Sequence, residues 1–334
     1  MDDLTIDRRR LLGGTAALAA AAAAAPVVAQ SGAAQPDLSG KTVLVTGASS
    51  GFGNLAALHL ARCGATVVAT MRNLNGGKRP EAQALKDAAA RDKLKVHLVE
   101  MDVTNDTQVS FGVTAGERIA GGALDAVICN AGIGLGGPVE TGDIDAWRKI
   151  MDTNLYGCLR VARAALPAMR KRKQGLVMPV SSQLGRIVSP GFGLYSATKF
   201  GVEAAFETMA YELAPFGVEV TIIQPGGYPT KVWANGQRYS EEMLRRVDAE
   251  RTAAYEQHIG FARAVFARTG TTDPMDVPRA FAEVIALAPG SRPLRRPVHP
   301  NTRATDAING VSAQVQTAVM ANGPFAAWHK AVTS

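Results

Sequence analysis

Cysteines, aromatic residues and long hydrophobic runs are scarce in this chain of 334 residues. The three cysteines, Cys63, Cys129 and Cys158, have no metal-binding spacing, and their odd number argues against a disulfide framework. After the first thirty residues, no apolar stretch is long enough to span a bilayer. The net charge of +7 is spread along the chain without a basic face that carries aromatic residues. We therefore expect a globular protein with buried free thiols, no metal site and no nucleic-acid partner.

The first thirty residues differ from the rest of the chain. The arginines Arg8–Arg10 precede an alanine-rich apolar region over residues 11–25, and the small residues at 27–29 follow it. This is the layout of a secretory signal that is cleaved before Gln30. Twin arginines mark the bacterial route that exports folded proteins. We expect residues 1–29 to be a twin-arginine (Tat) signal peptide that engages the Tat machinery and directs the protein to the periplasm. A membrane anchor and a cytoplasmic extension are the alternatives.

Apolar, β-branched runs alternate with amphipathic segments in the remaining chain. The runs cover residues 41–46, 65–70, 95–100, 124–129, 175–180 and 218–223. Continuous apolar runs are typical of a sheet that is buried on both faces. Their alternation with helices predicts an α/β fold: a Rossmann-type, doubly wound parallel sheet in a single domain. We expect a linker at 30–37, this domain at 38–300 with a helical substrate lid at 231–270, and a C-terminal tail at 301–334.

Ligands of such sheets bind beyond the carboxyl ends of the strands, so the residues after each run are candidate site residues. The first run leads into the sequence TGASSGFG at residues 46–53. Glycines allow a tight turn and a close approach of the backbone to a ligand, and a helix N-terminus suits a pyrophosphate. We expect dinucleotide binding here; the alternative is a glycine-rich turn without a ligand. The candidates are Gly47, Ser49, Ser50, Gly51, Phe52 and Gly53.

The residues after the second run bear on the choice of dinucleotide. An acidic residue there would bind the ribose hydroxyls of NAD, but this run ends in Ala-Thr-Met-Arg72. Because a guanidinium pairs with phosphate, we expect NADP rather than NAD, unless Arg72 is simply a solvated loop cation. After the third and fourth runs come Asp102-Val103 and Asn130-Ala131-Gly132. We expect Asp102 to contact the adenine amino group and residues 130–132 to lie close to the cofactor. The alternative for both segments is a role in turns alone.

Two serines and a tyrosine–lysine pair follow the fifth run. Tyr195 and Lys199 are four residues apart, hence neighbours on one helical face. An adjacent ammonium favours the phenolate form, which makes a tyrosine a usable acid or base near neutrality. Ser182 precedes Tyr195 by thirteen positions, with Ser181 as its less favoured neighbour.

Together these residues resemble the short-chain dehydrogenase/reductase family over residues 38–300. The motifs that carry the resemblance are TGASSGFG, Asp102-Val103, CNAG at 129–132, Asn154 in MDTNLYG, Ser182, YSATK at 195–199 and PGGYPT at 225–230. The resemblance implies that Tyr195 is the acid/base, that Lys199 binds the nicotinamide ribose and favours the phenolate, and that Ser182 orients the substrate oxygen. Asn154 would hold a water of the proton relay. Pro225, Gly226 and Thr230 would contact the nicotinamide end.

The same resemblance sets further expectations. The sequence at residues 67–73 and 130–140 is similar to that of the NADP-linked hydroxysteroid/retinol dehydrogenase branch. Members usually form homodimers or homotetramers through the two helices that hold Asn154 and Tyr195. Two features depart from the family pattern: Cys129 stands where an asparagine is frequent, and Pro179 lies inside the fifth run. Proline removes a donor from the strand ladder, so a bend before Ser182 is expected.

The lid and the loop before Tyr195 contain apolar and aromatic residues that suit a hydrophobic substrate. The pocket candidates are Leu184, Phe192, Tyr228 and Trp233, and the remaining apolar side chains of these segments are Leu194, Tyr239, Tyr255 and Phe261. We expect an oxidoreductase for a hydrophobic alcohol or ketone. The alternative for each aromatic residue is packing of the lid onto the sheet. The alternatives for the function are an NADP-binding redox sensor without turnover and an epimerase or dehydratase.

Overall fold

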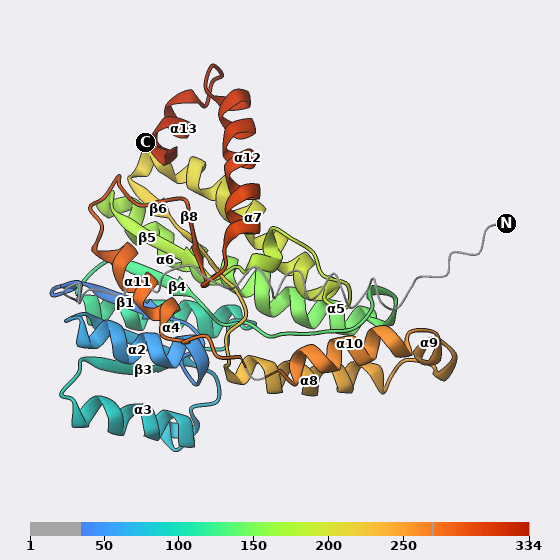
Figure 1. Cartoon of the computed structure of the whole chain (residues 1–334). Helices are drawn as coiled ribbons and strands as arrows, with labels where there is room; N and C mark the ends of the chain where they lie inside the picture. The colour runs from blue at the N-terminus through green and yellow to red at the C-terminus, as the bar shows by residue number, and fades with distance from the viewer. Residues whose placement is uncertain (1–34, 269, 334) are drawn as a thin grey trace. The chain divides into compact units, whose positions relative to one another are not determined.

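The core of the molecule is a parallel sheet of six strands in the order β3-β2-β1-β4-β5-β6 (Figure 1). The computed structural model describes residues 35–268 and 270–333. The strands are β1 (Thr42–Val45), β2 (Thr66–Met71), β3 (Val96–Glu100), β4 (Ala126–Cys129), β5 (Gly175–Pro179) and β6 (Val218–Val220). The chain runs from β1 to β3 in one direction and from β4 to β6 in the other, so the strand order reverses between β1 and β4. This arrangement confirms the predicted doubly wound fold and marks the place where such sheets bind ligands.

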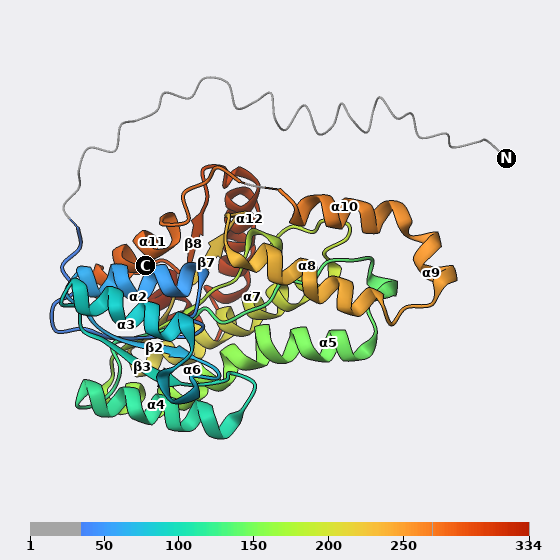
Figure 2. The same cartoon turned by 90° about the horizontal axis from the view of Figure 1, so that it is seen from below.

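Helices cover both faces of the sheet (Figure 2). One layer consists of α2 (Gly51–Arg62), α3 (Pro80–Arg91) and α11 (Asp276–Ala286), and the other of α4 (Asp106–Ala120), α6 (Gly157–Arg172) and α7 (Gly193–Leu213). Successive residues of a strand point to opposite faces. Val43 and Val45 therefore pack against the α2 layer, whereas Leu44 packs against the α4 layer. This two-sided burial explains the continuous apolar runs of the sequence.

The last predicted run divides at Thr221 into two short strands. β6 ends at Val220, and β7 (Ile222–Pro225) pairs with β8 (Arg295–Val298), a polar strand that the sequence did not suggest. Val177 of β5 pairs with Val220 and Val180 forms a bridge with Ile223, so Pro179 lies beside the division. A residue without an N–H group cannot donate to the ladder at this point, which gives a physical reason for the break. A bend was expected in β5 itself, but β5 stays paired with β4 as far as Pro179, and the break lies in the neighbouring strand.

The predicted lid is helical, as expected, and the tail is helical as well. The lid comprises α8 (Lys231–Leu244), α9 (Ala249–Ala254) and α10 (Glu256–Phe266), and α5 (Ile144–Met151) lies close to α8. The tail forms α12 (Arg303–Met320) and α13 (Ala326–Thr333), and α13 packs against α7. The short helical turns are η1 (Asn75–Gly77), η2 (Val139–Thr141), η3 (Asp152–Tyr156, a π-helix), η4 (Gln183–Gly185) and η5 (Ala214–Phe216).

Other expectations meet the structure only in part. Residues 1–34, which hold the predicted signal peptide and most of the linker, lie outside the described residues. Within the described chain, no helix combines the length and the apolar character that crossing a bilayer requires. Cys63, Cys129 and Cys158 are free and buried, as predicted. No cluster of three or more metal-binding side chains occurs among the described residues.

Candidate active site

A cleft of about 710 Å³ opens at the carboxyl ends of the central strands. The turn after β1 and the ends of β2 to β5 and β7 contribute to its walls, and lid helix α8 closes one side. Every predicted site residue lines this cleft except Gly53 and Asn154. The predicted residues that line it are Gly47, Ser49, Ser50, Gly51, Phe52, Arg72, Asp102, Val103, Asn130, Ala131, Gly132, Ser182, Leu184, Phe192, Tyr195, Lys199, Pro225, Gly226, Tyr228, Thr230 and Trp233.

The glycine-rich turn brings the backbone of β1 onto the N-terminus of α2. Gly47 and Gly51 have φ angles of +71° and +56°, a region that favours glycine. A Cβ atom on Gly53 would lie 2.4 Å from the carbonyl oxygen of Gly47, so Gly53 is needed for packing although it does not line the cleft. The N-cap residue Ser50 makes no side-chain bond to the first turn, which also lacks acidic residues. The N–H groups of this turn therefore remain available to an anion in the cleft.

Thr46 ties the turn after β1 to the loop after β4. Its hydroxyl accepts hydrogen bonds from the N–H groups of Asn130 and Ala131, at 3.0 and 2.9 Å. The side-chain amide of Asn130 donates in turn to the Thr46 carbonyl at 2.9 Å. These bonds hold the two loops together where the strand order reverses. Asn130 and Ala131 thus stabilise this turn, and residues 130–132 also line the cleft.

The end of β2 is cationic. Arg72 lies 3.9 Å from the carboxylate of Asp102, and Arg79 donates to the Arg72 carbonyl at 2.6 Å. Both arginines line the cleft, and β2 ends without a carboxylate. One oxygen of Asp102 accepts from the backbone and the hydroxyl of Thr104, at 2.9 and 2.8 Å, so Asp102 also stabilises its own turn. This end of the cleft suits an anionic group.

Tyr195 and Lys199 lie on the first two turns of α7, beside the end of β5. The Lys199 ammonium donates to the Val180 carbonyl at 2.8 Å and lies 5.6 Å from the centre of the Tyr195 ring. Lys199 is buried, whereas Tyr195 is half-buried and faces the cleft. Ser182 caps η4 by accepting from the N–H group of Leu184 at 3.1 Å, which fixes the serine beside the same cleft. A buried cation, a phenol and a hydroxyl therefore line one wall.

Asn154 lies on the π-helix η3 and is fully buried. Its amide pairs with both backbone groups of Ile133, at 2.8 and 2.9 Å, and donates to the Thr198 hydroxyl at 3.1 Å. Thr198 donates to the Tyr195 carbonyl at 2.7 Å. Asn154 thus connects the loop after β4 to the helix that carries Tyr195. A one-turn π-helix inside an α-helix is a frequent feature of functional sites. The water that Asn154 is expected to hold stays a prediction.

Aromatic side chains form part of the cleft wall. The Phe266 ring of α10 meets the rings of Phe192 and Trp233 edge-on, with centres 5.4 and 6.0 Å apart. Leu184 also lines this part of the cleft. Tyr228 lines the cleft too, but its hydroxyl donates to Asp276 at 3.1 Å. Burial and the neighbouring Asp276 carboxylate raise the pKa of Tyr228 well above its ordinary value, so this phenol stays protonated.

The remaining apolar candidates do not form the cleft, apart from Tyr239. Leu194 packs in a separate core cluster, the Tyr255 hydroxyl donates to Glu140 at 2.7 Å, and Phe261 is 43% exposed. Phe266 was missed, although Ile259 and Phe266 recur on one face of a helix. Arg79 and Arg238 were missed because nothing in their local sequence shows which way the lid and the loop after β2 turn.

The fold and this cleft define a class: oxidoreductases with a Rossmann-like domain. The family described as short chain dehydrogenase matches residues 41–240. The chain is 33% identical over 280 residues to retinol dehydrogenase 8 of Bos taurus. This match covers 80% of this chain and 84% of the relative. It is 33% identical to 17-beta-hydroxysteroid dehydrogenase type 1 of Homo sapiens over 72% of each chain. The protein therefore belongs to the short-chain dehydrogenase/reductase family, whose members act on alcohols and ketones.

Solved structures agree with this assignment. A short-chain dehydrogenase from Streptomyces avermitilis matches with a TM-score of 0.65 and 29% identity, over 84% of this chain and 95% of that one. A family member from Burkholderia phymatum in complex with NAD has a TM-score of 0.68 and 24% identity, over 84% and 96% of the two chains. A metagenomic member in complex with NADP has a TM-score of 0.61 and 24% identity, over 79% and 98%. Structures of this fold thus hold either dinucleotide.

Proposed function

We propose that this protein transfers hydride between NADP(H) and a hydrophobic alcohol or ketone, with Tyr195 as the acid/base. The observation that supports the proposal most strongly is that one cleft joins a free helix N-terminus, the Tyr195–Lys199 pair and an aromatic wall. Two relatives are named as a retinol dehydrogenase and a hydroxysteroid dehydrogenase, which agrees with a hydrophobic substrate.

The residues of the cleft fit a dinucleotide with an additional phosphate. The free N–H groups at the start of α2 suit the pyrophosphate, and Arg72 suits the 2′-phosphate of NADP. The absence of a carboxylate at the end of β2 disfavours NAD. When bound, the nicotinamide supplies or accepts the hydride, and the chain provides orientation and proton transfer.

The proton passes through the Tyr195 hydroxyl. In reduction, this hydroxyl donates its proton to the substrate oxygen, and in oxidation the phenolate accepts one. The Lys199 ammonium stabilises the phenolate by its charge, and its bond to the Val180 carbonyl fixes its position. Ser182 orients the substrate oxygen. Asn154 fixes the position of α7 relative to the loop after β4 through its bonds to Ile133 and Thr198, and it holds the relay water.

Paired substrates test this proposal. With NADPH, the protein should reduce 2-decanone much faster than dihydroxyacetone, because the aromatic wall excludes water and offers no partner to a polyol. Turnover of polar substrates alone would contradict the hydrophobic pocket. NADPH bound without any turnover would favour the redox-sensor alternative. Conversion without net NADPH consumption would favour an epimerase or dehydratase.

We also propose periplasmic residence after Tat export and association into a homodimer or homotetramer. The sequence of residues 1–29 supports export. Exposed apolar side chains on η3 and α7, Tyr156 and Phe200, support association through the helices that hold the site. At its other end α7 is covered by α13, where Tyr211 and His329 stack with centres 5.9 Å apart. Light scattering on the full chain tests the association, and a monomer at micromolar concentration would overturn it.

A further inference from the structure

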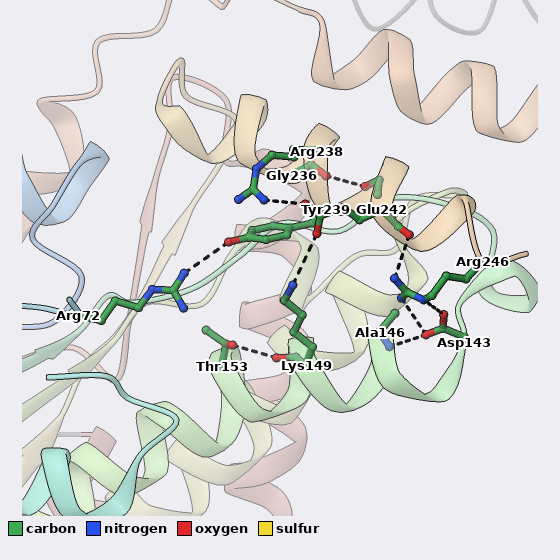
Figure 3. Close-up of polar contacts among 11 residues, drawn as sticks. Arg72, Asp143, Ala146, Lys149, Thr153, Gly236, Arg238, Tyr239, Glu242 and Arg246 are labelled. Atoms are coloured by element: carbon green, nitrogen blue, oxygen red, sulfur yellow. Dashed lines mark hydrogen bonds and ion pairs between the residues drawn. The ribbon is translucent and has the colours of Figure 1, made fainter.

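Lid helix α8 carries an arginine into the part of the cleft where the dinucleotide's adenosine half is expected. Arg238 lines the cleft together with Arg72 and Arg79, although it is more than 150 residues away from them in sequence. Figure 3 shows Arg72 reaching from the end of β2 towards Tyr239, with Arg238 beside the same ring. A second hollow of about 730 Å³ shares Arg72 and Arg79 with the cleft and adds Lys78 to its lining.

Tyr239 connects the lid to the end of β2. The Arg72 guanidinium donates to the Tyr239 hydroxyl at 3.5 Å. The Arg238 guanidinium and the Lys149 ammonium of α5 each lie 4.3 Å from the centre of the Tyr239 ring. Such cation–π contacts fix the ring without neutralising the cations. Burial raises the pKa of Tyr239, but hydrogen bonds from Arg238 and Arg72 outweigh this effect and lower the pKa below its ordinary value.

The cationic groups outnumber the carboxylates near Tyr239 and in the adjoining hollow. Arg72 faces Asp102 at 3.9 Å, and Arg79 pairs with Glu81 at 3.0 Å. Glu242 is shared between Arg238 at 2.7 Å and Lys149 at 3.9 Å. With Lys78 and Glu100, which line the adjoining hollow, five cations stand against four carboxylates. The side chains of Arg72 and Arg238 are 53% and 55% exposed, so both can reorient towards an anion.

We propose that Arg238 of the lid completes, with Arg72 and Arg79, a binding site for the 2′-phosphate of NADP, so that this phosphate holds the lid onto the dinucleotide. The inference rests on the proposed NADP dependence and goes beyond it, because it assigns a phosphate contact to the substrate lid. Two arginines from different segments form stronger charge-assisted bonds to one phosphate than one arginine alone. NADPH would then close the lid more firmly than NADH.

Binding of adenosine 2′,5′-bisphosphate and of 5′-AMP, measured by calorimetry, tests the site without turnover. The wild-type protein should bind the bisphosphate at least about tenfold more tightly than AMP, and Arg238→Gln should reduce this ratio by about tenfold. Arg245→Gln, an exposed arginine after α8 that does not line the cleft, should leave the ratio unchanged. Equal thermal midpoints by circular dichroism show that both variants fold.

The lid itself supplies a second readout. Trypsin should cut the wild-type lid at Arg245 or Arg251 more slowly with the bisphosphate than with AMP, and Arg238→Gln should abolish this difference. If Arg72→Gln removes the preference for the bisphosphate and Arg238→Gln keeps it, the role of the lid is overturned. The proposed function then still stands. A wild-type protein without any preference overturns both the site and the NADP dependence.

Discussion

At the scale of single residues, Tyr195 is the group on which the proposed chemistry depends. Tyr195→Phe removes only the hydroxyl and leaves the ring in the cleft wall. We expect kcat to fall by about 10²- to 10⁴-fold, the usual contribution of a general acid or base, with unchanged NADPH affinity. Steady-state kinetics and a fluorescence titration of NADPH measure the two quantities.

Tyr211→Phe on the same helix is the matched control. Burial and the Glu207 carboxylate raise the pKa of Tyr211 to about 12, so this tyrosine stays protonated over the assay range. It does not line the cleft, and its loss should leave kcat unchanged. Carbonyl reduction that survives Tyr195→Phe would show that another group transfers the proton.

Gly53 tests the glycine-rich turn at the same scale. In Gly53→Ala the new methyl group would press on the Gly47 carbonyl, so the turn must shift. We expect the free energy of unfolding to fall by about 1–3 kcal/mol and NADPH binding to weaken. Urea denaturation and a binding titration measure both effects. Gly310→Ala on α12 meets open space and should stabilise the protein slightly, by up to about 1 kcal/mol. Equal effects of the two changes would contradict the role of the turn.

At the scale of elements, Asp143 joins α5 to the lid. Its carboxylate caps α5 by accepting from the Ala146 N–H group at 2.6 Å, and it pairs with Arg246 after α8 at 2.6 Å. Asp143→Asn keeps the cap and removes the ion pair, so we expect a loss of up to about 1 kcal/mol of unfolding free energy. Asp143→Ala also removes the cap and should cost about 1 kcal/mol more. Urea denaturation at neutral pH ranks the three proteins.

The contribution of the Asp143–Arg246 ion pair to stability depends on pH, because only the charged carboxylate forms the pair. The hydrogen bond from Arg246 lowers the pKa of Asp143 below its ordinary value. Its stabilising contribution is therefore fully present above about pH 4 and is lost as the pH falls through the lowered pKa. The difference in stability between wild type and Asp143→Asn should shrink at acid pH. A difference that persists under acid conditions would mean that the ion pair does not contribute.

The elements also show how far the sequence alone can be interpreted. β1, β4 and β5 were recognised because burial on both faces leaves continuous apolar runs. β8 was missed because Arg295 and Arg296 owe their place in a strand to pairing with β7, a contact distant in sequence. The glycine-rich turn and Tyr195 with Lys199 were found because each is a local motif. Arg238 and Phe266 reach the site only through the docking of the lid. The helical spacing of Ile259 and Phe266 indicates a buried face, but it does not show what covers that face.

At the scale of the whole molecule, the proposed route of export bears on cofactor retention. NADP is made in the cytoplasm, so a chain that folds before Tat export can carry the cofactor with it. We expect the double change Arg8→Lys and Arg9→Lys to keep the protein in the cytoplasm, because the twin arginines mark this route. Immunoblots of periplasmic and cytoplasmic fractions, with a cytoplasmic marker enzyme as control, measure the distribution.

Retention of the cofactor has its own measurement. Protein purified from the periplasm should release NADP that mass spectrometry identifies after denaturation. The three thiols, Cys63, Cys129 and Cys158, should resist alkylation in the folded state because they are buried, so a chain that is exported folded, as proposed, would keep them shielded from an oxidising compartment. Periplasmic protein that lacks both cofactor and activity, or unimpaired export of the arginine variant, would contradict this account.

The central claim is a hydride transfer in which NADPH reduces a hydrophobic ketone. The most direct test is incubation of the protein with 2-decanone and NADPH that carries deuterium at the transferred position of the nicotinamide, followed by mass spectrometry of the product. We predict that 2-decanol carries one deuterium on its carbinol carbon and that its amount equals the NADPH consumed. Unlabelled 2-decanol, or bound NADPH that is never oxidised, would contradict the claim.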